Sequence, residues 1–76
     1  RWIARERHRE TALELVRTVE RQLPVVLAGT VKDDVQAGLE SLNAQIAAHN
    51  GAGEAGNAVP LLDVDSLMRE WAQRRR

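Results

Sequence analysis

The chain lacks cysteine, phenylalanine and tyrosine, has only two prolines, and carries no net charge. Without cysteine it can form neither a disulfide nor a thiolate zinc site to support a small core. Trp2 and Trp71 are its only aromatic residues, so the middle must pack on Ala, Val, Leu and Ile. No apolar run approaches the roughly 20 residues of a membrane helix, and the first residues lack the apolar segment of a signal peptide. We expect no membrane partner. The cellular location stays unassigned, with an intracellular one favoured.

With 76 residues the chain forms at most one small domain, because chains of this length bury only about 60% of their unfolded surface. It begins at Arg1 rather than Met, and we interpret it as a fragment of a longer protein. Its formal charge is +2 over residues 1–23, −5 over residues 24–66 and +3 over residues 67–76. Basic ends around an acidic middle favour hairpin packing or pairing between copies.

Apolar residues at steps of three and four predict a first helix over about residues 3–23. Leu15, Val16, Val19 and Leu23 fall on one face of this helix. Pro24 interrupts the pattern, since it has no N–H to donate and its ring crowds the preceding turn. Two interpretations stay open: Pro24 bends one long helix, or it separates two. We place the break between Pro24 and Thr30.

A second helix is predicted over about residues 31–49, and the two helices form a hairpin domain over residues 1–50. Its apolar stripe consists of Val31, Val35, Leu39, Leu42 and Ile46. Gly38 lies beside the stripe, where it either admits a close neighbour or is a tolerated imperfection. Asn50 and Gly51 predict the end of the helix, with glycine in the left-handed conformation.

Residues 51–59 are small and glycine-rich, which predicts a flexible linker. An amphipathic C-terminal segment follows over residues 60–76, with Asp63 as the N-cap of a short helix. The side chains spaced to form its docking face are Leu62, Val64, Leu67, Met68 and Trp71. Such a face either packs in cis on the hairpin or docks in trans on a partner.

The sequence offers no chemistry that points to catalysis or to a cofactor. His8 and His49 are far apart and lack further ligands at metal-binding spacing. Ser41 and Ser66 have no histidine nearby in the sequence, and no glycine-rich phosphate motif is present. We therefore predict no catalytic, metal or cofactor site, and no enzyme activity. The Arg-rich N-terminus makes nucleic-acid binding a third possibility, disfavoured by its interspersed glutamates.

These observations predict an all-α fold, a helical hairpin plus a short C-terminal helix, assembling as an oligomeric helical bundle. The hydrophobic ridge of the two hairpin helices is too broad for one copy to cover, and a core without Phe leaves only about 3–5 kcal/mol of stability. We therefore expect a self-association module, most simply a homodimer, of scaffolding type. The alternative is a docking module that binds a different protein through residues 62–71. The predicted self-association interface is Leu15, Val16, Val19, Leu23, Val26, Leu27, Val31, Val35, Leu39, Leu42 and Ile46.

Overall fold

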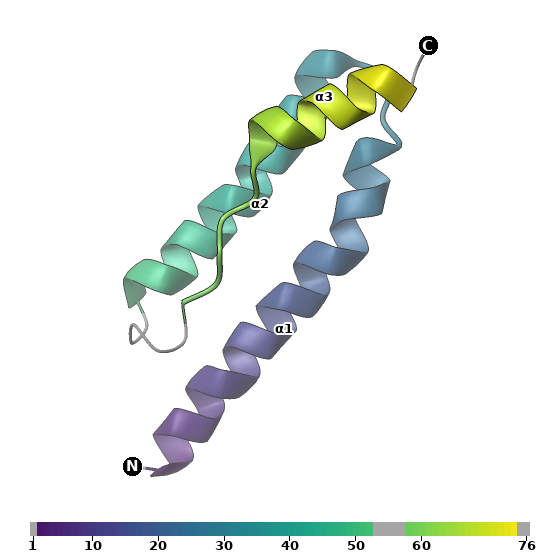
Figure 1. Cartoon of the computed structure of the whole chain (residues 1–76). Coiled ribbons are helices and arrows are strands. Elements are labelled where there is room, and N and C mark those ends of the chain that lie inside the picture. Colours follow the sequence, from purple (N-terminus) through teal and green to yellow (C-terminus); the bar gives the residue numbers. More distant parts are fainter. Residues whose placement is uncertain (1, 53–57, 75–76) are drawn as a thin grey trace.

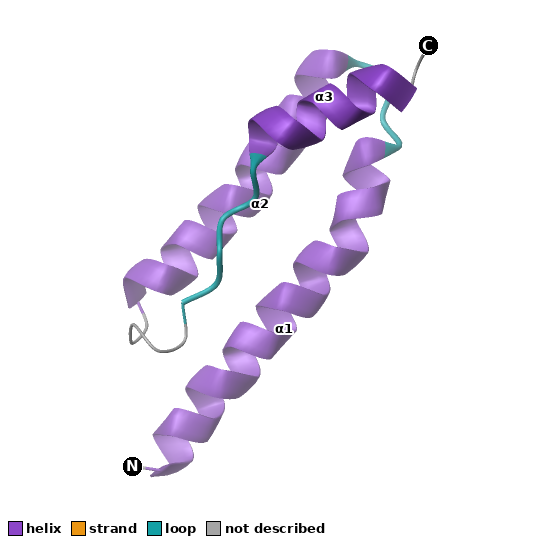
Figure 2. Cartoon of the chain, in the orientation of Figure 1, coloured by secondary structure: helices purple, strands orange, loops and turns teal. Residues whose placement is uncertain are grey.

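The computed structural model describes the backbone of residues 2–52 and 58–74, and the side chains of residues 11–51 and 58–74. Within these residues the chain forms three helices and no strand: α1 (Trp2–Leu27), α2 (Lys32–Ala52) and α3 (Val64–Arg74). Figure 1 shows α1 and α2 as an antiparallel hairpin, with α3 lying across the end where the two helices are connected. Figure 2 shows the extended loop that leads along α2 into α3. The predicted all-α class is confirmed.

Pro24 lies inside α1 and does not end it. The helix continues to Leu27, Ala28 N–H donates to the Pro24 carbonyl at 3.0 Å, and Gly29 N–H donates to the Val26 carbonyl at 3.1 Å. The chain therefore leaves the helix at residues 28–31, four residues later than the sequence predicts. Pro24 removes a single N–H close to the helix end and is itself exposed, while packing of Val26 on α2 holds the last turn in place.

The predicted stop at Asn50 and Gly51 is wrong, because α2 continues to Ala52 and no described glycine has a positive φ. The helix begins at Lys32, one residue after the predicted start. Its first turn is closed by Val35 N–H, which donates to the Val31 carbonyl at 3.0 Å. Asp33 and Asp34 lie in the first turn, where carboxylates favour the positive end of the helix. The last turn stays helical because Asn50 uses its side chain to bind the backbone of Val59.

The core lies between α1, α2 and the extended segment over residues 58–63. Its buried side chains are Val19, Val35, Leu39, Leu42, Ile46 and Val59. Gly38 lets α1 approach α2 closely, since a Cβ atom at this position would lie 2.7 Å from Cγ1 of Val26. Most of the core comes from α2, whereas among residues 11–27, the part of α1 whose side chains are described, Val19 alone is buried.

The molecule is elongated, with principal extents of 52 × 18 × 15 Å and a radius of gyration of 14.4 Å. A compact domain of this length has a radius of gyration of about 11 Å. The solvent-accessible surface of 5829 Å² is also roughly a quarter larger than the value of about 4,700 Å² that is usual for a compact monomer of this mass. The chain therefore leaves an unusually large share of its surface uncovered.

Candidate interaction surface

Two asparagines of α2 hold the extended segment in place. Asn43 Nδ2 donates to the Leu62 carbonyl at 3.0 Å, and Leu62 N–H donates to Asn43 Oδ1 at 2.7 Å. Asn50 makes the same pair of bonds with Val59, at 2.9 Å to its carbonyl and 2.8 Å from its N–H. Each carboxamide thus offers one donor and one acceptor to one backbone residue. We call Asn43 and Asn50 the asparagine pair.

The spacing of the asparagine pair matches the spacing of the residues it binds. Seven residues along an α-helix span about 10.5 Å. Three residues of extended, polyproline-like chain span about 9.3 Å. Because Asn43 binds the later residue, Leu62, the segment runs antiparallel to α2. Pro60, which has no N–H to satisfy, lies between the two bound residues and is exposed.

Asp63 caps α3, as predicted. Its Oδ1 accepts from Ser66 N–H at 3.2 Å, its Oδ2 accepts from the Ser66 hydroxyl at 2.8 Å, and its carbonyl accepts from Leu67 N–H at 3.0 Å. The hydrogen bonds from the Ser66 hydroxyl and backbone N–H lower the pKa of the Asp63 carboxyl below its ordinary value, with a smaller contribution from the charge of Arg69. The carboxylate form therefore favours the folded helix.

The predicted docking face is engaged within the chain itself. Trp71 reaches across the hairpin end, and its indole Nε1–H donates to the Gly29 carbonyl at 2.9 Å. Leu62 packs against the core. All five predicted docking residues are half-buried, namely Leu62, Val64, Leu67, Met68 and Trp71. In this structure the C-terminal helix thus packs in cis.

The predicted self-association residues divide into three groups, which are buried, half-buried and exposed. Val19, Val35, Leu39, Leu42 and Ile46 are buried inside the single chain and do not form part of its surface. Five others, Leu15, Val16, Leu23, Val26 and Leu27, are half-buried, and Val31 is 52% exposed. From Val35 to Ile46 the stripe of α2 is thus covered in cis, while Val31 and the stripe of α1 are covered only in part.

Beside its core-facing residues, α1 carries a stripe of exposed and half-buried side chains, which we call the α1 flank. Glu20 stands four residues after Val16 and three before Leu23, and the apolar members of the flank are Leu13, Val16, Leu23, Pro24 and Leu27. Val16 and Leu23 also pack against the core. Leu13 is 50% exposed, and Glu20 lies in the middle of the stripe. At one end, a groove is lined by Leu23, Pro24, Leu27, Ala28 and, from α3, Arg74.

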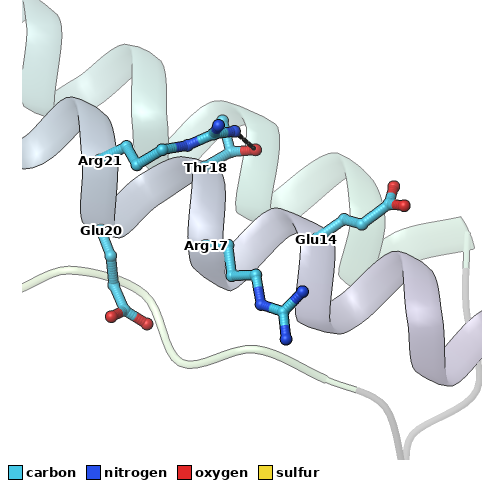
Figure 3. A pocket seen from close by; sticks show the side chains of 5 residues that line it. All are labelled: Glu14, Arg17, Thr18, Glu20 and Arg21. Atoms are coloured by element: carbon cyan, nitrogen blue, oxygen red, sulfur yellow. Dashed lines mark hydrogen bonds between the residues drawn. The ribbon is translucent and has the colours of Figure 1, made fainter.

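Over residues 11–27 the other side of α1 is polar apart from Val25, which is 74% exposed. Val25 lies nine residues, or about two and a half turns, beyond Val16, so it points away from the α1 flank. Figure 3 shows Arg17 and Glu20 projecting from one side of the helix and Thr18 and Arg21 from another, where Arg21 donates to the Thr18 hydroxyl at 3.4 Å. Together with Glu14 they line an open depression of about 600 Å³ on the surface of α1.

The described residues contain no group of three or more His, Cys, Asp or Glu placed to hold a metal ion. None of the described helices has the length and apolar character needed to cross a bilayer. The arginines of the predicted nucleic-acid segment, Arg1, Arg5, Arg7 and Arg9, as well as His8, have side chains outside the described residues. His49 is half-buried in the last turn of α2.

Sequence reasoning missed the asparagine pair and the burial of Val59. Asn43 and Asn50 lie seven residues apart beside the apolar stripe of α2, a signal that two polar side chains share one helix face. That signal does not show what they bind. Searches of protein-family models, curated proteins and solved structures find no match to this chain. Its function must therefore be argued from its own surface.

Proposed function

We propose that this chain is a non-catalytic protein–protein interaction module that associates with another copy of itself through the α1 flank. The observation that carries the proposal is the surface left uncovered, about a quarter more than a compact monomer of the same mass exposes. Small helical chains without disulfides commonly gain stability by oligomerisation. Each further Leu or Val that becomes fully buried contributes about 1.5–3 kcal/mol.

The location of the uncovered surface favours one form of assembly over another. A four-helix core built from the stripes of both hairpin helices would need Val35, Leu39 and Ile46 at the interface, and these are already buried in cis. The α1 flank, by contrast, keeps Leu13 and Pro24 exposed and Leu27 half-buried. The proposed interface is therefore formed by α1 against α1, with α2 and α3 as supports behind it.

The test is the concentration dependence of molar mass, measured by sedimentation equilibrium from the micromolar to the millimolar range. We expect the mass to rise from 8.5 kDa towards twice that value. Leu13→Glu places a charge in the α1 flank at an exposed position, and we expect it to weaken association at least about tenfold, equivalent to 1.4 kcal/mol.

Val25→Glu is the matched control, because Val25 is even more exposed than Leu13 and lies on the opposite side of α1. We expect it to change the association constant by no more than about twofold, in line with ordinary surface substitutions. Helix content measured by circular dichroism should be the same in both variants. A chain that stays at 8.5 kDa throughout, or equal effects of the two variants, would refute the proposal.

A further inference from the structure

The α1 flank is nearly symmetric about its central residue, Glu20. Leu13 and Leu27 lie seven residues before and after it, and Val16 and Pro24 lie four residues before and after it. An interface with two-fold symmetry requires this property, because each residue that contacts a second position must be contacted by that position in return. An antiparallel copy of the flank therefore presents an apolar residue opposite Leu13, Val16, Pro24 and Leu27, though not opposite Leu23.

The charges at the centre are also self-complementary. Glu20 and Arg17 are both exposed and project from the same side of α1 (Figure 3). When the two-fold axis passes close to Glu20, Arg17 of one copy lies within one helical turn of Glu20 of the other. Without a counter-charge, the two Glu20 carboxylates would repel each other. With Arg17 of each copy beside them, the four charges have a net charge of zero.

We infer that two copies pair through α1 in antiparallel orientation about a two-fold axis close to Glu20, with Arg17 and Glu20 forming reciprocal ion pairs across the axis. This inference rests on the proposed self-association and specifies its orientation and register. Each Leu13 then packs against Leu27 of the second copy, and each Val16 against Pro24. The stripe is complementary to a second copy of itself, and a partner of different sequence would not share this symmetry.

The experiment is a charge swap on the full chain, followed by sedimentation equilibrium. Arg17→Glu gathers four negative charges at the axis and Glu20→Arg gathers four positive ones, so we expect each variant alone to associate at least tenfold more weakly. The two variants mixed together should recover association as a heterodimer, and the double variant should recover it as a homodimer. The signature of the inference is this reciprocal rescue, which a merely structural role of either residue would not produce.

Arg21→Glu is the matched control, because it makes the same change of charge on the same helix at a side chain that bonds to Thr18 instead. It should leave association within about twofold of the unmodified chain. Helix content measured by circular dichroism identifies any single variant that fails to fold. In that case the association of the double variant, measured at low and high salt, takes the place of the mixing experiment. If the charge-swap variants dimerise as tightly as the unmodified chain, the proposed register is wrong but the proposed function still stands. A chain that is monomeric at every concentration contradicts both proposals.

Discussion

At the scale of single residues, the carboxamide is the group that joins the C-terminal part of the chain to the hairpin. Asn43 and Asn50 each satisfy both backbone groups of one residue in a segment that has no helix or strand partner of its own. Unpaired backbone groups in a partly buried loop would otherwise cost free energy. In the described residues no buried side-chain nitrogen or oxygen lacks a hydrogen-bond partner. Binding the extended segment therefore leaves no buried polar side-chain atom unsatisfied.

Asn43→Ala should lower the free energy of unfolding by about 1–2 kcal/mol, because it leaves the N–H and carbonyl of Leu62 without their partner. Urea denaturation followed by circular dichroism measures this change. Gln45→Ala, at an exposed position of the same helix, is the control and should stay within about 0.5 kcal/mol. If both variants lower the free energy of unfolding by the same amount, water replaces the carboxamide. The asparagine pair then does not stabilise the position of the extended segment.

At the scale of elements, the hairpin packs closely because one glycine and one valine are complementary in shape. Gly38 has no Cβ, and Val26 of α1 occupies the space that a Cβ would take. The same contact stabilises the last turn of α1 beyond Pro24. The glycine inside α2 and the proline inside α1 are thus both accommodated by the packing of Val26. Glycine inside a helix costs about 1 kcal/mol relative to alanine, and here the close approach of α1 offsets that cost.

Gly38→Ala and Gly51→Ala therefore should have opposite effects on the free energy of unfolding. Both replacements favour α2 intrinsically, but a Cβ at Gly38 meets Val26 at 2.7 Å whereas a Cβ at Gly51 meets nothing within 4 Å. Valine cannot yield easily because its χ1 is stiff. We expect Gly38→Ala to destabilise by about 1 kcal/mol and Gly51→Ala to stabilise by about 0.5 kcal/mol in thermal or urea denaturation.

Adding Val26→Ala to Gly38→Ala tests the cause of that difference. The double variant should lose less stability than the two single changes together, since the residue that clashes has been shortened. Additive effects would show that the contact between Gly38 and Val26 is not what limits the approach of the helices.

The cap of α3 gives this element a dependence on acid. The pKa of Asp63 is lowered in the folded chain, so its contribution to stability is present above the unfolded pKa of about 3.9 and is lost as the pH falls through the lower folded value. Asp63→Asn keeps an oxygen that can accept from Ser66 N–H but does not titrate.

We therefore expect the melting temperature of the unmodified chain to fall more than that of Asp63→Asn as the pH is lowered from 6 towards 2. Thermal melts followed by circular dichroism across this range measure the difference, in which the contributions of the other carboxyl groups cancel. Parallel curves for the two proteins would mean that the Asp63 carboxylate does not stabilise α3. Asp63→Ala should have the lower melting temperature at every pH, because it removes the cap itself.

At the scale of the whole molecule, the chain buries part of its apolar surface within itself and leaves another part accessible to solvent. The extended segment and α3 lie against the hairpin and are held at three points, by Asn43, Asn50 and Trp71. This arrangement buries Val35, Leu39, Leu42 and Ile46 of α2 and leaves the α1 flank only partly covered along a molecule 52 Å long. Such a shape favours side-by-side pairing of long helices, because that mode of contact covers the most apolar surface of an elongated body.

The sequence by itself determined the helices, since apolar spacing and caps are local properties that act through neighbouring turns. The three helices, the cap at Asp63 and the apolar stripes of α1 and α2 could all be predicted from it. Only the tertiary structure decided that α1 passes through Pro24, that Asn50 binds Val59 rather than ending α2, and which stripe is covered in cis. These outcomes depend on contacts between residues far apart in the chain, whose energies outweigh local preference and leave no periodic signal in the sequence.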